Sequence, residues 1–360
     1  MTELFSPATR RTGWILLLAG AITVVGLHPS GGTAFSADEV KPHQFDAKTK
    51  QSIDRGLQFL VTTIRRDGTV GTDLHQPPDL GCTAMVGLAL LSDGSTPRGG
   101  RYVRESTQVL YGVLDLIQQR PLRTTGLTEV TLVQRKIGIN ADLFLATLYL
   151  SEVYYEAPGA ETEIRAALTK LVEHICLTQG KDGTWGSESW APVLGTVMGW
   201  ECLRSASSAG FQIEASARLV GEALMANLKK RSTDEQNWMH EFYKDASSLR
   251  VLYSLNYRDD VVFKECLDRL LNRVKSDPRP FQLAGGEEYL SFFLVTECLL
   301  KEPKPEWAAW YPRVRDELML TQNRDGSWTG HHCITNRTFC TAAALLTLTA
   351  PNLTLTMSEL

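Results

Sequence analysis

Apolar residues along this chain follow a helical period, and they do so in pairs of unlike segments. In the first segment of a pair, apolar positions recur every three to four residues among polar ones, as at Ile53, Leu57 and Leu60. The second segment is apolar nearly throughout, as in 139–155 and 286–301. This spacing is typical of helices, and no alternating strand pattern competes with it in the sequence. The pattern therefore predicts an all-α protein.

Three of the pairs share a signature in the loop between their segments. Asp-Gly-x-Trp stands at 182–185 and 325–328, and a weaker copy stands at 67–71. In each copy a threonine follows the aspartate by about 14 to 16 residues and opens the apolar run, at Thr83, Thr196 and Thr341. Three further pairs lack the signature: 101–119 with 139–155, 214–230 with 245–256, and 260–275 with 286–301. A unit of about 50 residues thus repeats as six helix pairs.

The two kinds of helix predict a closed ring. A helix that is apolar on every side must be buried on every side. We therefore expect the second helices to form an inner ring and the first helices to surround it, as an (α/α)6 toroid over residues 50–350. An open superhelix is the alternative, but its concave face would be wet and would need more polar residues. Closure would bring the starts of all inner helices to one mouth.

The loop signature has a structural explanation. Asp-Gly forms a turn in which the glycine is free to adopt positive φ. The tryptophan can cover the end of the preceding helix, and the glutamine before the turn can satisfy free backbone groups at that helix end. The residues assigned to this structural motif are Gln179, Asp182, Gly183, Trp185, Gln322, Asp325, Gly326 and Trp328.

Gln-x-x-Asp-Gly-x-Trp followed by an apolar helix resembles the repeat of squalene–hopene cyclases and protein prenyltransferase β-subunits (the QW motif). The resemblance covers about residues 45–350 and implies a terpenoid cyclase-like α/α-toroid with a central apolar cavity. Some members of that superfamily cyclise isoprenoids, some transfer prenyl groups with zinc, and some only bind. The acidic Asp-x-Asp-Asp motif of the cyclases is absent here, and Asp79 and Cys82 do not match the Asp-x-Cys spacing of the transferases.

The N-terminus is predicted to be a targeting segment. Arg10 and Arg11 precede an apolar run at 13–27, and a small-residue stretch at 34–36 resembles a cleavage site. We expect a signal peptide at 1–36, a polar linker at 37–49 and a tail at 351–360. The protein would then be exported to the periplasm or outside the cell. An uncleaved signal would instead anchor it, and that segment would be its only membrane contact.

Composition narrows the functional classes. Hydrophobic residues make up 43% of the chain and charged residues 22%, which excludes a disordered chain. With 37 basic and 41 acidic residues and no basic stripe, nucleic acid is not an expected partner. The seven cysteines are an odd number and mostly lie in apolar runs, so we expect buried thiols. A Cys333–Cys340 disulfide is the alternative that export would permit.

Titratable residues concentrate at the expected mouth, where the inner helices begin. Glu287 and Glu288, acting with Asp142 or Asp245, are candidates for general acid and base on a glycan. Acids in the first turn of a helix are also favoured by the helix dipole alone, which is the simpler explanation. The other polar residues expected there are Asp79, Cys82, Asn140, Glu188, Trp190, His240, Tyr243, Tyr289 and Arg337.

His331, His332 and Cys333 are candidate metal ligands by residue type. They lack a helical i, i+4 placement, so solvated loop histidines beside a buried thiol are the expected arrangement. The sequence thus predicts neither a metal nor a cofactor.

Two functions remain open at this point. The first is an exported toroid that binds an apolar or extended ligand, or a protein partner, without standard cyclase chemistry. The alternative is an enzyme, either terpene cyclase-like or glycan-active, that uses the mouth carboxylates. An open cavity with a converging acid pair would favour the enzyme. A cavity filled by Phe144, Phe292 and Phe293 would favour the binding protein. The partner would be an apolar small molecule, a glycan or a protein, and the sequence does not decide whether the chain is catalytic.

Overall fold

The computed structural model describes residues 45–122, 130–229, 238–300 and 304–352, which belong to one compact unit. The expected signal peptide, residues 37–44 of the linker and most of the tail lie outside the described residues. The first helix begins at Ala47, inside the range expected to be linker. Within the described residues, no helix combines the length and the apolar character that a bilayer span requires.

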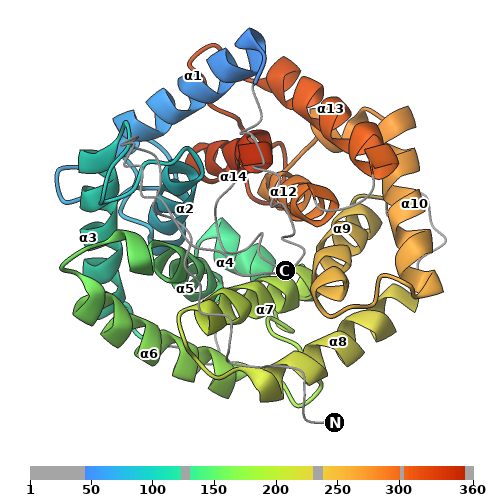
Figure 1. Ribbon diagram of the computed structural model, residues 1–360, viewed down its shortest axis with the longest axis horizontal. Coiled ribbons are helices and arrows are strands. Elements are labelled where there is room, and N and C mark those ends of the chain that lie inside the picture. The colour runs from blue at the N-terminus through green and yellow to red at the C-terminus, as the bar shows by residue number, and fades with distance from the viewer. Residues whose placement is uncertain (1–44, 123–129, 230–237, 301–303, 353–360) are drawn as a thin grey trace, which may run out of the picture. The chain divides into compact units, whose positions relative to one another are not determined.

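The described helices form two concentric rings (Figure 1). The outer ring consists of α1 (Ala47–Thr63), α3 (Val103–Gln119), α6 (Glu161–Thr178), α8 (Glu214–Lys229), α10 (Val261–Ser276) and α13 (Lys304–Thr321). The inner ring consists of α2 (Leu80–Ser92), α5 (Ala141–Val153), α7 (Pro192–Ser208), α9 (Trp238–Ser254), α12 (Gly286–Leu300) and α14 (Arg337–Thr349). Short elements precede or follow inner helices: α4 (Leu132–Ile137), η1 (Tyr154–Glu156), α11 (Arg279–Gln282) and η3 (Ala350–Asn352).

The difference between the two kinds of helix explains the rings. Outer helix α3 buries Val109, Leu110 and Val113 while Tyr111 is 49% exposed, as an amphipathic helix should be. Every residue of inner helices α2 and α5 is buried. Each inner helix packs against the next, and α14 packs against α2. The prediction of six helix pairs in a closed ring is confirmed, and the open superhelix is wrong.

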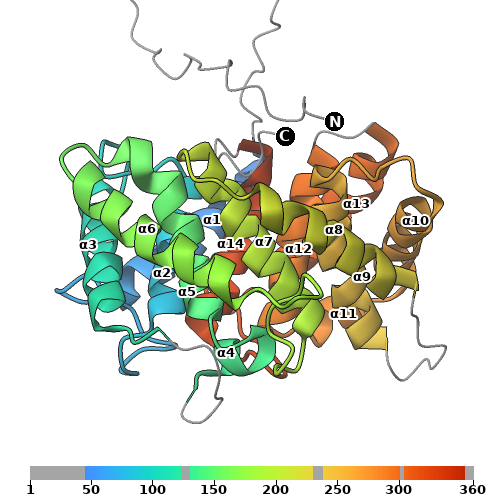
Figure 2. The ribbon, with the colours of Figure 1, turned by 90° about the horizontal axis from the view of Figure 1, so that it is seen from below.

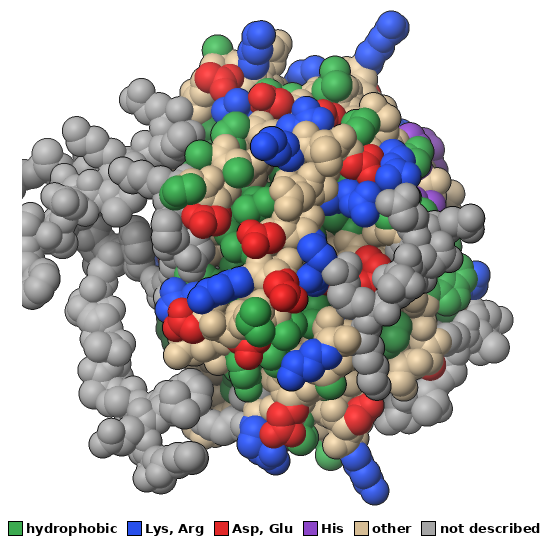
Figure 3. Space-filling view, turned by 90° about the vertical axis from the view of Figure 1, so that its right-hand side faces the viewer, with side chains coloured by type: hydrophobic (Ala, Val, Ile, Leu, Met, Phe, Trp, Pro, Cys, Tyr) green, Lys and Arg blue, Asp and Glu red, His purple; other side chains and the backbone are tan. Residues whose placement is uncertain are grey.

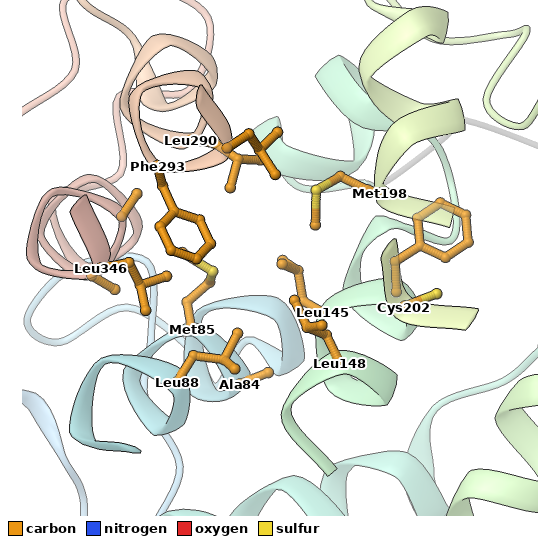
Figure 4. Packing of buried hydrophobic residues seen from close by; sticks show 14 of the residues in the cluster. Ala84, Met85, Leu88, Leu145, Leu148, Met198, Cys202, Leu290, Phe293 and Leu346 are labelled. Carbon is orange, nitrogen blue, oxygen red and sulfur yellow. The ribbon is translucent and has the colours of Figure 1, made fainter. Parts of the chain in front are cut away.

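The middle of the inner ring is filled with apolar side chains. Figure 4 shows Met85, Leu145, Met198, Leu290 and Phe293 pointing toward one another from four different inner helices. Each of these side chains is at most 2% exposed. No space for a sugar ring or an isoprenoid remains among these described residues. The central cavity that the family resemblance implied is therefore not present there.

Only one of the three phenylalanines expected to fill the centre lies in it. Phe293 points into the middle of the ring. Phe144 instead contacts Trp185, with ring centroids 6.3 Å apart, and Phe292 stacks on Phe281 at 5.0 Å. Neighbouring positions on a helix face different directions, so Phe292 and Phe293 cannot share the centre.

The turn glycine has the same conformation in all three copies of the loop, and the two motif tryptophans make the same contact. Gly68, Gly183 and Gly326 have φ of 80°, 85° and 92°, which explains the glycine in the turn. The indole Nε1 of Trp185 donates to the carbonyl of Ile175 at 2.9 Å, in the last turn of α6. Trp328 does the same in α13, donating to Leu318 O at 2.8 Å. The prediction that the tryptophan covers the end of the preceding helix is confirmed.

The glutamine of the motif has a different role from the one expected. The Gln179 amide donates to Gly183 O in its own loop and to Ser216 O on α8, at 3.1 and 3.4 Å. The Gln322 amide likewise donates to Gly326 O and to Ser52 O on α1, at 2.8 and 2.9 Å. The glutamine therefore joins consecutive outer helices, because the loop lies against the next repeat rather than over its own helix.

One rim of the rings carries the described loops that lead from an outer to an inner helix. Figure 2 shows α4 and α11 on this rim, and each directly precedes an inner helix. The expected mouth is therefore formed. The outer face in Figure 3 mixes Lys and Arg with Asp and Glu, without a patch of one sign.

All seven cysteines lie in the described part and are free thiols. Cys333 lies beside Lys136, while Cys340 is buried on α14 and donates to Ile334 O at 3.6 Å. The Cys333–Cys340 disulfide is therefore not formed, and the expectation of mostly buried thiols is confirmed.

Candidate functional site

The start of α12 is covered by the loop that precedes α14. Gly286 N donates to Ile334 O, and His331 N donates to Ala284 O, both at 2.8 Å. A Cβ on Gly286 would lie 2.5 Å from the Ile334 side chain, so only glycine allows this approach. The contact places residues 331–333 directly over the first turn of α12.

His332 lies between the two consecutive glutamates of that turn. Its Nδ1 is 3.3 Å from Glu287 Oε1, and its Nε2 is 3.1 Å from Glu288 Oε2. Both glutamates are buried, while 24% of the His332 side chain is exposed. These two contacts raise the pKa of His332 to about 11, so its imidazole is a cation at neutral pH.

A second cation comes from α4. Lys136 Nζ is 2.9 Å from Glu287 Oε1 and 3.5 Å from Cys333 Sγ, and it lies 4.6 Å from the centre of the Tyr243 ring. The side chain of Lys136 is only 3% exposed. Burial alone would lower the pKa of Lys136, but the charge of Glu287 outweighs it and raises that pKa. The lysine is therefore charged.

The two glutamates differ in acidity because their surroundings differ. Burial raises the pKa of both carboxyls. For Glu287 the hydrogen bond from His332 and the charge of Lys136 outweigh burial, so its pKa lies below the usual range. For Glu288 burial dominates and the neighbouring charge of Glu287 adds to it, so its pKa is raised. Glu287 is thus an ionised carboxylate and Glu288 the better proton donor.

Glu288 also has a free oxygen. Its Oε2 accepts a hydrogen bond from Gly285 N at 2.7 Å and contacts His332. Its Oε1 is buried and has no hydrogen-bond donor among the described residues. A carboxyl oxygen in this state is available to a ligand or to water.

The cluster reaches the rim through His240. Its Nδ1 is 3.0 Å from the Tyr243 hydroxyl, and the imidazole itself is exposed. Burial raises the pKa of Tyr243 to about 12, so the phenol stays protonated. The polar residues of the cluster therefore continue from the buried glutamates to the solvent.

Three donor groups of the cluster are of the kind that zinc prefers. One ligand atom each from Glu287, His332 and Cys333 lies within 4.8 Å of the others. The ammonium of Lys136 already contacts two of these three groups. A metal ion would meet this fixed positive charge, so the residues present do not fit a zinc centre. His331, the third candidate ligand, does not join this group.

Asp142 and Asp245 are not brought to the glutamates. Asp142 pairs with Arg120 through both of its oxygens, beside a groove of about 270 Å³. Asp245 pairs with Arg269 at 3.0 Å, beside a groove of about 300 Å³ between α9 and α10. Each acid that was expected to act with Glu287 and Glu288 is instead held by its own arginine.

Sequence reasoning missed two groups of buried charged residues. Lys136 was overlooked because α4 is too short to show a period. The second group lies further along the inner helices, where Arg250 Nη2 is 3.7 Å from Glu201 Oε2 and Arg250 Nε is 3.5 Å from Glu297 Oε2. Burial raises the pKa of Glu297 to about 7. The signal in the sequence was that charged residues occur within helices that are otherwise apolar, which indicates buried ion pairs.

No protein-family profile and no curated protein sequence matches the chain. One solved structure is similar to it: an α-1,6-mannanase, GH76A of Salegentibacter sp. HEL1_6, in complex with α-1,6-mannotriose. That protein is an inactive variant in which two consecutive aspartates are replaced by asparagine. The similarity has a TM-score of 0.54 at 11% identity and covers 84% of this chain and 99% of the mannanase chain.

The chain is an (α/α)6 toroid. At 11% identity the similarity shows the fold alone. The all-α toroid implied by the QW-type motif is thus confirmed. Membership of the prenyltransferase and squalene cyclase family itself is not shown.

Proposed function

We propose that the protein is an exported glycan-active enzyme that cleaves a glycosidic bond at the mouth of the toroid. The observation that carries this proposal is the opposite acidity of Glu287 and Glu288 around one imidazole. Glycoside hydrolysis needs one protonated and one ionised carboxyl, and an acid and a base are recognised by environments that push their pKa values apart. The toroid of a mannanase shares the fold and supports the same substrate class.

The proposed roles follow from the contacts. Glu288 gives its proton to the glycosidic oxygen as the bond to the sugar carbon breaks. Glu287 takes a proton from the water that attacks that carbon. His332 touches both carboxyls, at 3.3 and 3.1 Å, and its positive charge keeps Glu287 ionised. Glu287 then releases its proton to solvent, and Glu288 takes one up from solvent. Because His332 lies over both groups, a substrate reaches them only when the loop at 331–333 shifts.

A non-catalytic binding protein is the second candidate, and a specific observation favours it. Glu287 is already paired with both Lys136 and His332, and both glutamates are buried. In such a protein the cluster would only fix the loop over α12. Because the centre of the ring is filled, a ligand would bind at the mouth under either candidate function.

Hydrolysis assays separate the two candidates. Purified protein without residues 1–36 is incubated with α-1,6-mannan and with α- and β-linked manno-, gluco- and xylo-oligosaccharides, and new reducing ends are measured. We expect Glu288→Gln to abolish cleavage. The matched control is Glu297→Gln, which changes another buried glutamate of α12 away from the mouth and should keep activity. Glycan binding without cleavage by the wild type would favour the second candidate.

A further inference from the structure

We infer that Trp190 is a stacking platform on which the glycan lays a pyranose ring beside Glu287 and Glu288. This inference rests on the proposed function, because it names a subsite for the same ligand. Trp190 is 50% exposed, and the other tryptophans among the described residues are buried or half-buried. Trp185, five positions earlier, is 3% exposed, so the two rings have different roles.

The backbone of Trp190 is fixed to α4. Trp190 N donates to Arg135 O at 3.1 Å, and Ala191 N donates to Lys136 O at 2.9 Å. Proline at position 192 then begins α7. The indole therefore stands on a rigid support, and a ligand would not have to order this segment in order to bind.

The ring of Trp190 is also oriented. The guanidinium carbon of Arg135 lies 5.6 Å from its centroid, over one side of the indole. The exposed half of the side chain is left for another flat partner. A pyranose ring has C–H groups on its faces and hydroxyls at its edge, so it can stack on the indole while its hydroxyls bond to polar neighbours.

Contacts along α4 join this platform to the acid pair. Arg135 touches Trp190, and the next residue, Lys136, reaches Glu287 at 2.9 Å. Because consecutive residues of a helix face different directions, Trp190 and Glu287 contact different sides of α4, and an extended glycan that spans this short helix would meet both. An isoprenoid has no ring hydroxyls for this polar route, which favours a carbohydrate as the occupant.

Binding is measured by titration calorimetry with α-1,6-mannotriose and the oligosaccharide panel, using wild type, Trp190→Ala, Trp190→Phe and the control Tyr155→Ala. Tyr155 is 60% exposed and lies in η1, directly after the last residue of inner helix α5, so it lies at the end of α5 opposite its start at the mouth. For the best ligand we expect Trp190→Ala to raise the Kd about tenfold or more, the value for losing a good aromatic contact. Trp190→Phe should retain most of the affinity, and Tyr155→Ala should leave the Kd unchanged.

Two results would overturn the inference: a wild type that binds none of these glycans, or a Trp190→Ala protein that binds as tightly as wild type. Failure of the proposed catalysis has a different signature. In that case the wild type binds but does not cleave, and the Kd still depends on Trp190. Cleavage that is lost in Glu288→Gln, with a Kd independent of Trp190, would leave the catalysis standing and the platform refuted.

Discussion

Gln322 and Ser52 are 270 positions apart and exchange two hydrogen bonds where the last repeat meets the first. Ser52 Oγ donates to Gln322 Oε1, and Gln322 Nε2 donates to Ser52 O, both at 2.9 Å. Arg55 on the same helix donates to Asn323 O at 2.6 Å. The motif that joins neighbouring outer helices elsewhere thus also closes the ring.

We expect Gln322→Ala to lower the free energy of unfolding by about 1–3 kcal/mol, since it removes both bonds to Ser52 and leaves a backbone carbonyl unpaired. Gln179→Ala is the matched control within the chain, and its cost should be smaller because its bond to Ser216 is longer, at 3.4 Å. Urea unfolding of both variants tests this. Equal costs would show that closing the ring adds nothing to the local motif.

Replacing the motif tryptophans should be more costly. Trp185 and Trp328 are 3% and 0% exposed, and each donates to the helix before it. Trp185→Ala and Trp328→Ala should each lower the free energy of unfolding by about 3 kcal/mol or more. Trp190→Ala, at an exposed position, should change it by about 0.5 kcal/mol at most. Thermal melts that cannot distinguish the three variants would contradict the structural role of the motif.

The ring could be predicted from the sequence because the apolar pattern that requires it extends over many positions. Every residue of α2 and α5 is buried, and such uniformly apolar helices have one environment available to them. The filling of the centre could not be predicted in the same way. Phe292 and Phe293 look equivalent in the sequence, and only the rotation of α12 sends one outward and the other to the centre.

The mouth cluster was predictable in part. Glu287, Glu288, His332 and Cys333 were expected near the mouth, and the structure brings them together. Their pairing depends on how the loop before α14 crosses α12, which is a tertiary contact with no local pattern. Lys136 could not be found because α4 is too short to show a period, and because it reaches Glu287 from the second repeat.

The charge of His332 should stabilise the fold at neutral pH and cease to do so at alkaline pH. Its pKa is about 11 in the folded protein against 6.5 without partners. The folded state therefore holds a proton that the unfolded chain has lost, so this stabilisation is complete below pH 6.5 and disappears as the pH rises through 11. We expect the melting temperature of wild type to exceed that of His332→Gln most at pH 6 and least at pH 11. A constant difference across this range would show that His332 is not charged in the fold.

Glu297 should also make stability fall as the pH rises, but over a lower pH range. Its pKa is raised to about 7 from 4.5 by burial, although Arg250 partly offsets this. Between these values the folded protein holds a proton that the unfolded chain has released, so stability falls as the pH rises from 4.5 to above 7. The charged groups around it are Glu152, Glu201, Arg204 and Arg250.

Glu297→Gln should gain stability relative to wild type between pH 5 and pH 8. Parallel melting curves for the two proteins would contradict the raised pKa.

Lys136 should decide whether the mouth accepts a metal ion. In the wild type its ammonium contacts Glu287 and Cys333, and its charge repels a divalent cation. Lys136→Met removes that charge and keeps the length of the side chain, leaving the carboxylate, the thiol and His332 within 4.8 Å of one another. We therefore expect Zn²⁺ to bind Lys136→Met at least about tenfold more tightly than wild type, measured by competition with a chromophoric chelator.

Lys136→Met combined with Cys333→Ser should lose this gain, which separates binding at the mouth from binding elsewhere. Equal affinity of wild type and Lys136→Met would contradict the role of the lysine in excluding a metal ion from the mouth.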